Sequence, residues 1–378
     1  MHARTRRLLV GFLVGFLVVA AAPTIAIAAS DGEIPRMPDG KPDLSGTYDI
    51  ATLTPLQRPA RYGDKLYLSP EEARAIEERE REFLAKANES SDPNRQAPDE
   101  GGDVPFGFDG SEPGLLAASG NVGGYNGFWI DRGDSVVEVD GQFRTSIITE
   151  PANGQQPPPA AEAMPRMRAL ADQFHANDGT AFWLGWDRPG PYDDIEQRPL
   201  PERCLLTFST AVPALPSLYN NTKRIVQTAD QVMILNEMVH DARVVRLNSE
   251  HASPDLRFWM GDSIGWWEGD TLVVETTNFK SEPGGYYYGP VDRLKVIERF
   301  TRWDEKTLHY AFEVENADRW TAAWKGDFTW PSIDDQPEGK VSEGRVYEYA
   351  CHEGNYALGN ILRGARLLES EAAEGSSE

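Results

Sequence analysis

The sequence is poor in basic residues and lacks a glycine-rich nucleotide-binding loop, and each shortage excludes a class of function. Its 37 lysines and arginines are outnumbered by 60 aspartates and glutamates, giving a formal charge of −23. A surface this acidic repels phosphate backbones, so we expect no nucleic-acid partner. No glycine-rich loop separates a strand-like from a helix-like segment, so we expect no nucleotide or other cofactor.

Long apolar runs are absent after the first 28 residues. Residues 2–7 (HARTRR) are basic, residues 8–22 are apolar, and residues 26–28 (AIA) are small, which predicts a signal peptide over residues 1–28. The apolar run is shorter than the roughly 20 residues of a membrane span, although an uncleaved anchor is the alternative. We therefore expect a periplasmic or secreted protein without stable membrane insertion after cleavage. No cysteine stands at the cleavage point, which argues against a lipid anchor.

Only two cysteines are present, Cys204 and Cys351, and both belong to the mature chain. In an exported protein, such a pair predicts a disulfide. Two buried free thiols are the alternative.

Short strand-like segments joined by turn residues predict a mainly β fold. Turns are expected at Asp140-Gly141, at Ala229-Asp230, at 268–270 and at 304–306. Hairpins at this spacing indicate an antiparallel barrel or sandwich with peripheral helices, and the lipocalin-like barrel is one form of it. Ser69 and Pro70, followed by Glu72, predict a helix over 70–87. Further helices are predicted over 162–175 and 355–370.

Composition divides the chain into four parts. We predict a signal peptide (1–28), an N-terminal extension with one helix and a polar linker (29–120), a β-rich main domain (121–366) and an acidic tail (367–378). The linker is inferred from the abundance of Asp, Glu, Pro, Gly and Ser over 88–120.

Five motifs occur in a distinctive order: NVGGYNGFWIDRG (121–133), RTS (144–146), EMVHDAR (237–243), GDSIGWWEGDTLVVE (261–275) and CHEGN (351–355). In these motifs the chain resembles a large family of exported bacterial proteins usually described as hypothetical, and the likeness extends over about residues 39–366. The resemblance implies a periplasmic or secreted location and a shared site around the motifs. It implies no reaction, because the family has no established activity. An arginine is usual there where this chain has Trp266.

Two histidines inside these motifs are candidates for acid–base chemistry. His240 stands beside Asp241, and His352 stands beside Glu353. A histidine oriented by a carboxylate suits proton transfer near neutral pH. The alternative is a structural histidine that is hydrogen-bonded within a barrel wall.

The Glu-x-x-His spacing at 237–240 would place two metal ligands on one face of a helix. The segment around it reads as a strand, on which Glu237, Asp241 and Arg243 would share one face and His240 the other. We therefore predict no metal site, and we expect Arg243 to stabilise developing negative charge.

Aromatic and acidic residues of the motifs are candidates for substrate binding, because aromatic rings bind sugar faces and aromatic ligands, although they also fill cores. Asp262, Glu268 and Asp270 could serve glycoside chemistry, but such acids more often lie in solvated turns. The predicted substrate-binding residues are Tyr125, Asn126, Trp129, Arg243, Asp262, Trp266 and Trp267.

The resulting hypothesis is an exported, cofactor-independent acid–base enzyme, a lyase, isomerase or hydrolase, acting on a small neutral sugar-like or aromatic molecule. Its predicted catalytic residues are Glu237, His240, Asp241, His352 and Glu353. One alternative is a lipocalin-like protein that binds a ligand without turning it over. Another is an envelope scaffold whose acidic motifs are structural.

Overall fold

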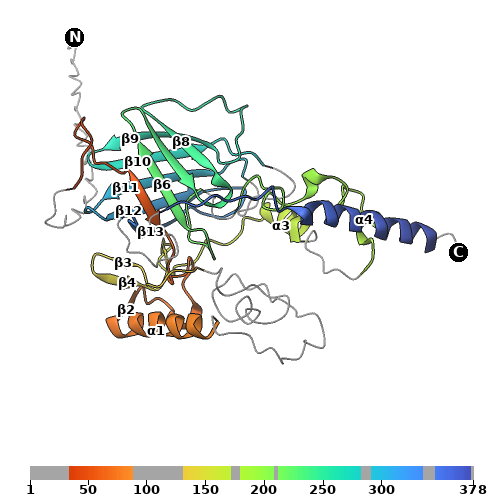
Figure 1. Cartoon of the computed structure of the whole chain (residues 1–378), viewed down its shortest axis with the longest axis horizontal. Coiled ribbons are helices and arrows are strands. Elements are labelled where there is room, and N and C mark those ends of the chain that lie inside the picture. The colour runs from red at the N-terminus through yellow and green to blue at the C-terminus, as the bar shows by residue number, and fades with distance from the viewer. Residues whose placement is uncertain are drawn as a thin grey trace, which may run out of the picture.

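The computed structural model describes residues 34–87, 131–171, 179–207, 212–281, 291–334 and 345–375. The predicted signal peptide and the candidate residues Tyr125, Asn126 and Trp129 lie outside these ranges. Within them the fold is mainly β, as predicted, with helices at the periphery (Figure 1).

The main body is a ten-stranded, strongly curled sheet (Figure 1). All neighbouring strands are antiparallel except β8 and β9, which are parallel and are joined by the long connection at 248–261. In spatial order the strands are β1 (Gly46–Asp49), β6 (Thr222–Gln227), β7 (Gln231–Asn236), β8 (Ala242–Leu247), β9 (Asp262–Glu268), β10 (Thr271–Thr277), β11 (Lys295–Arg302), β12 (Thr307–Glu315), β13 (Trp324–Pro331) and β5 (Ile148–Glu150).

The sheet curls far enough for β1 to meet the end of β13. Tyr48 of β1 forms an isolated antiparallel bridge with Ser332. The Ile333 N–H donates to the Thr47 carbonyl at 2.9 Å. The sheet therefore has a barrel-like form, with an inner and an outer face on each strand, and we call it the barrel.

Large aromatic side chains fill much of the interior, because alternate residues of each strand point inward. Tyr310, Phe328 and Trp330 are fully buried. The Tyr310 ring centroid lies 5.5 Å from that of Phe328 and 4.6 Å from that of Trp330. The interior is thus a packed core in this region, unlike the open ligand cavity of a lipocalin-like barrel.

A second, three-stranded sheet lies beside β13, and its strands are β2 (Tyr67–Leu68), β4 (Gln142–Arg144) and β3 (Glu138–Val139) (Figure 1). Its predicted hairpin turn is confirmed, with φ of 52° at Asp140 and 72° at Gly141. Positive φ at both positions is the geometry that makes Asp-Gly turns common.

The helix α1 (Pro70–Ala87) packs next to this sheet and begins where predicted. The Glu72 N–H donates to Ser69 Oγ at 3.2 Å, and the Ser69 N–H donates to Glu72 Oε2 at 2.7 Å. These two reciprocal bonds form a capping box, so local sequence explains the start of the helix.

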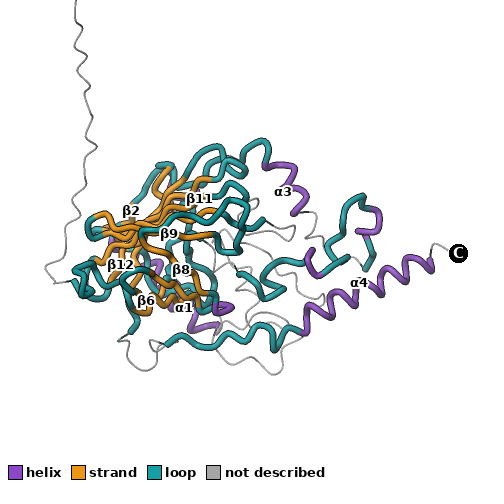
Figure 2. Tube along the Cα trace, turned by 90° about the horizontal axis from the view of Figure 1, so that it is seen from above, coloured by secondary structure: helices purple, strands orange, loops and turns teal. Residues whose placement is uncertain are grey.

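Other helices lie beside the barrel, and α4 (Tyr356–Gly375) extends away from it (Figure 2). The helix α3 (Ala163–Ala171) starts within the predicted segment, and α4 continues past the predicted end at 370 into the acidic tail. Short 3₁₀ helices are η1 (Ala60–Tyr62), η4 (Phe182–Gly185), η5 (Ile195–Gln197) and η7 (Met238–His240). Among the described helices, none combines the length and apolar character needed to cross a bilayer.

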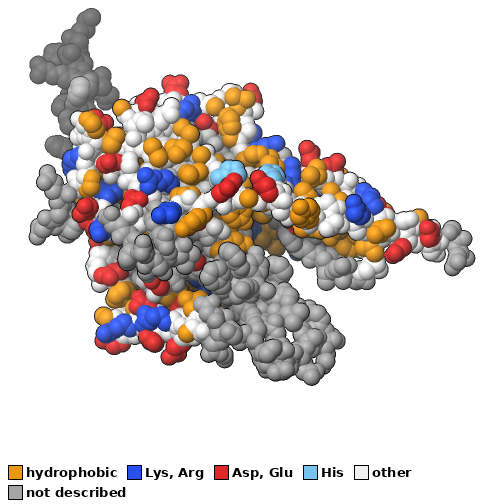
Figure 3. All heavy atoms as spheres, viewed as in Figure 1, with side chains coloured by type: hydrophobic (Ala, Val, Ile, Leu, Met, Phe, Trp, Pro, Cys, Tyr) orange, Lys and Arg blue, Asp and Glu red, His pale blue; other side chains and the backbone are white. Residues whose placement is uncertain are grey.

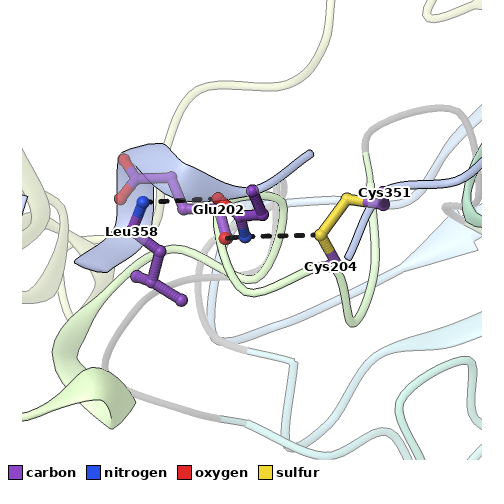
Figure 4. The surroundings of a disulfide bond; sticks show 5 residues. Glu202, Cys204, Cys351 and Leu358 are labelled. Carbon is purple, nitrogen blue, oxygen red and sulfur yellow. Dashed lines mark hydrogen bonds between the residues drawn. A yellow bond between two sulfur atoms is a disulfide. The ribbon is translucent and has the colours of Figure 1, made fainter. Parts of the chain in front are cut away.

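The predicted disulfide is present between Cys204 and Cys351, whose Cα atoms are 5.8 Å apart (Figure 4). Next to it, Asn355 Nδ2 donates to the Glu202 carbonyl at 2.6 Å. The bridge fixes the chain that leads into α4 against residues 199–206, and it indicates folding in an oxidising compartment.

One local prediction was wrong. The segment 237–241 is no strand, because β7 ends at Asn236 and η7 turns the chain into β8. Val239 and His240 have φ of 59° and 46°, which is turn geometry. The face predicted to contain Glu237, Asp241 and Arg243 therefore does not exist as a strand face.

Candidate functional site

The turn between β7 and β8 nevertheless gathers charged side chains at one end of the barrel. We name Asp49, Lys223, Glu237, Asp241 and Arg243 the Lys223 cluster, because the charges of the other four act on the Lys223 amine. Lys223 is fully buried, and Glu237 and Arg243 are 7% and 6% exposed. Three residues predicted from sequence, Glu237, Asp241 and Arg243, thus belong to one group.

Two members of the Lys223 cluster exchange protons near neutral pH. Burial is the largest cause of a fall in the pKa of Lys223 from 10.5 to about 7, and the charge of Arg243 adds to it. The three carboxylates act in the opposite direction. Burial also raises the pKa of Asp49 from 3.8 to about 6, with help from the charge of Asp131.

Arg243 belongs at the same time to a polar network inside the barrel. Both of its Nη atoms bind the carboxylate of Glu298, which is fully buried, and Nη2 lies 2.9 Å from Oε1. Tyr310 Oη donates to Glu298 Oε1 at 2.8 Å and accepts from the Ala214 N–H at 2.9 Å. The guanidinium is therefore neutralised by a protein carboxylate, and its predicted role towards a substrate finds no support here.

Glu237 also connects the cluster to the C-terminal segment. Its Oε1 accepts from the Tyr347 N–H at 3.2 Å, and its Oε2 accepts from Asn220 Nδ2 at 3.3 Å. The carboxylate therefore holds two chain segments against the end of the barrel.

The two predicted histidines lie at the surface. His240, His352 and Glu353 are exposed, and Asp241 is half-buried. Figure 3 shows histidine side chains beside acidic ones on the surface between the barrel and α4. No hydrogen bond or ion pair between His240 and His352 is recorded within the described ranges, so their predicted cooperation remains a hypothesis.

The predicted tryptophan wall is divided between the two faces of β9. Trp267 pairs with Leu272 and packs against the barrel core, whereas Trp266 pairs with Val273, and its indole N–H donates to Glu268 at 3.1 Å. Neighbouring residues of a strand point to opposite faces, so Trp266 and Trp267 form no common wall.

Asp262 lies on the outer face of β9, next to His251, which is not among the predicted site residues. His251 Nδ1 is 2.9 Å from Asp262 Oδ2, and His251 Nε2 is 3.2 Å from Glu275 Oε1. Burial alone would raise the pKa of Asp262, but hydrogen bonds from the Ala252 N–H and His251, with the Arg246 charge, lower it below its usual value. His251 thus fastens the 248–261 connection to two strands.

A groove of about 550 Å³ lies between the barrel and the small sheet. Its walls come from the two hairpin turns that meet there, the β3–β4 turn and the β11–β12 turn, and from β12 and β13. The lining residues are Glu138, Asp140, Gly141, Trp303, Asp304, Thr307 and Thr329. The groove offers one aromatic ring, carboxylates and two hydroxyls to a ligand.

A histidine and an aspartate lie behind the tryptophan of the groove. The rings of Trp303 and His309 are stacked, with centroids 4.5 Å apart and planes 6° apart. His309 Nε2 is 3.1 Å from Asp327 Oδ2, and that oxygen is 3.5 Å from Arg144 Nη2. The sequence indicates Arg144 only as part of a motif, and Trp303, His309 and Asp327 are not among the predicted site residues.

One sequence signal could have identified the buried charges. Along β11, Glu298 falls between Val296 and Phe300 in the inward-pointing register, and along β6 Lys223 precedes Ile225 in the same way. A charge at an apolar position of an alternating strand marks a buried charge. The groove has no comparable signal, because its walls come from distant segments.

In the described part of the chain, no three His, Cys, Asp or Glu side chains are arranged to hold a metal ion. Comparisons with protein families, curated proteins and solved structures find no match to this chain.

Proposed function

We propose that the protein binds a small sugar-like or aromatic molecule in the groove beside Trp303. The observation that carries the proposal is the lining of the groove, where an indole stands among carboxylates and the hydroxyls of Thr307 and Thr329. Sugar rings present apolar faces to indoles and hydroxyls to carboxylates. The volume of about 550 Å³ also lies in the usual range for ligand sites.

The groove is a better candidate than the barrel interior. Tyr310, Phe328 and Trp330 occupy the interior, and Glu298 is neutralised there by Arg243. A ligand inside would have to displace well-packed side chains, which is costly. In this proposal the barrel is a scaffold, and the ligand binds outside it.

The test is calorimetric titration with neutral mono- and disaccharides and with phenolic compounds. We expect at least one compound to bind, and Trp303→Ala to weaken binding by about tenfold or more, because aromatic contacts often dominate binding. Trp266→Ala is the matched control, since Trp266 is half-buried on the outer face of β9, away from the groove. No binding by the natural protein, or an equal loss in both variants, would refute the proposal.

An acid–base enzyme is the second candidate, favoured by the Lys223 cluster. Burial sets the pKa of Lys223 to about 7 and that of Asp49 to about 6, so both exchange protons near working pH. The assay incubates the same compounds with the protein and analyses them for conversion. Turnover lost in Lys223→Met would support this candidate. Turnover retained in both His240→Ala and His352→Ala would show that these histidines are not catalytic. A ligand recovered unchanged would favour binding alone.

We also propose export to the periplasm or beyond. The Cys204–Cys351 disulfide supports an oxidising compartment. Cell fractionation and N-terminal sequencing of the purified protein test the proposal. We expect the mature chain to start after residue 28, and recovery of residues 1–28 in the mature protein would contradict cleavage.

A further inference from the structure

We propose that His309 is a positioning residue, which holds Trp303 at the groove and does so more firmly when its imidazole is protonated. The inference rests on the proposed function, because it concerns how one side chain of the groove is held in place. His309 itself does not line the groove. It concerns Trp303, the aromatic residue on which that function depends.

The stack of the two rings carries the inference. His309 on β12 and Trp303 after β11 lie nearly parallel, 6° apart, with centroids separated by 4.5 Å. Rings in this arrangement are in face-to-face contact. The electrons of an indole ring attract an imidazolium placed over its face more strongly than they attract a neutral imidazole. The charge of His309 therefore acts directly on the ring that forms part of the groove.

Two other strands fix the orientation of His309. Its Nε2 lies 3.1 Å from Asp327 Oδ2 on β13, and a carboxylate can only accept, so this nitrogen carries the proton of the bond. Asp327 Oδ2 is in turn 3.5 Å from Arg144 Nη2 on β4. The side chains of His309, Asp327 and Arg144 are only 14%, 17% and 10% exposed, so the row is mostly shielded from water.

The charges around His309 come from each neighbouring element. Asp327 approaches from β13, and Arg144 from β4 stands behind it. On β11 the direct neighbour is the uncharged Thr301, while Arg299, one pair further along the same face, is bound to Glu268. Asp304 follows Trp303 in the β11–β12 turn. The nearest charge is thus the Asp327 carboxylate, which complements an imidazolium.

Nuclear magnetic resonance of the protein without ligand tests the inference first. The indole N–H signal of Trp303 is the one that disappears in Trp303→Phe. We expect it to move along a single-proton curve as the pH is varied, because the indole lies face to face with a ring whose charge changes. His309→Phe keeps a ring in the stack but cannot titrate, so the movement should vanish. His352→Phe, which changes an exposed histidine, is the control and should keep it.

Two results would overturn the inference: a Trp303 signal that ignores pH in the natural protein, or the same pH dependence in His309→Phe. Either result would show that the His309 charge does not reach the indole. Neither result depends on knowing the ligand.

Binding of p-nitrophenyl β-glucoside, which carries a sugar and an aromatic ring, tests the consequence. We expect binding to be about tenfold weaker at the high-pH end of the Trp303 resonance curve than at its low-pH end in the natural protein, and to be independent of pH in His309→Phe. His309→Ala, which removes the ring stacked on Trp303, should bind weakly at both ends.

The outcomes separate the inference from the proposed function. If Trp303→Ala abolishes binding while His309→Phe keeps the natural pH profile, the proposed function of the groove is supported and the proposed role of His309 is refuted. If Trp303→Ala binds as well as the natural protein, or the natural protein does not bind this glucoside, the evidence counts against the groove function. The resonance experiment then still decides whether His309 positions Trp303.

Discussion

Replacing Lys223 by methionine should make the protein more stable below pH 7 and should remove part of its pH dependence. Lys223 is fully buried on β6, and burial lowers its pKa from 10.5 to about 7. Methionine has a similar length and no charge, so the variant removes the cost of burying an ammonium group. At high pH the Lys223 amine of the natural protein is neutral in the folded state as well. The natural protein and the variant then have similar free energies of unfolding.

The sign follows from the number of protons bound. Below pH 7 both the folded and the unfolded natural chain carry the Lys223 proton. Between pH 7 and 10.5 only the unfolded chain keeps it, so the free energy of unfolding rises by about 1.4 kcal/mol per pH unit. Over the full interval between the two pKa values this amounts to about 5 kcal/mol, the upper limit of the gain expected for Lys223→Met at low pH.

Urea denaturation followed by tryptophan fluorescence at several pH values from about 6 to 9 measures the effect. Lys306→Met is the control, because Lys306 is exposed in the β11–β12 turn and should change stability little. We expect the stability difference between Lys223→Met and the natural protein to shrink as the pH rises. A difference that stays constant over this range would refute the reasoning, since it would mean that Lys223 keeps its proton in the folded state.

Three further changes test other parts of the structure. Glu298→Gln leaves the Arg243 guanidinium buried beside a neutral amide, so the free energy of unfolding should fall by about 3 to 5 kcal/mol in urea titrations. Asp49→Asn should stabilise the protein above pH 6 by at most about 3 kcal/mol and hardly at all below pH 3.8, because its pKa is raised from 3.8 to about 6; thermal denaturation against pH checks this. Cys204→Ser with Cys351→Ser removes a bridge between residues 147 apart, worth about 5 kcal/mol in the chain-entropy model, and amide hydrogen exchange should rise first in α4.

Local features of the sequence predicted the parts of the fold that depend on local chemistry. The Asp140-Gly141 turn formed because these residues tolerate positive φ, and α1 begins at Pro70 because Ser69 and Glu72 cap it. The prediction failed at 237–241, where the apolar alternation of β7 was extended too far. The chain must turn there to pair β8 with β7, and that requirement comes from the sheet.

The candidate site was less predictable, because its residues come from separate segments. Trp303 and Asp304 lie in the β11–β12 turn, while Glu138 and Asp140 come from the β3–β4 hairpin of the small sheet. Nothing in either segment alone indicates that the two turns meet. The densest motifs instead drew attention to His240 and His352, which the fold leaves at the surface.

The sequence by itself determined that the chain is mainly β, where several of its hairpins turn and how α1 begins, and it predicted the bridge between Cys204 and Cys351. Only the tertiary structure decided that Lys223 and Glu298 are buried with compensating charges, and that Trp303 stands at a groove with His309 stacked behind it. The physical reason is that turns, caps and strand patterns act over a few residues. The pKa of a buried amine and the shape of a groove depend instead on side chains that only the curled sheet brings together.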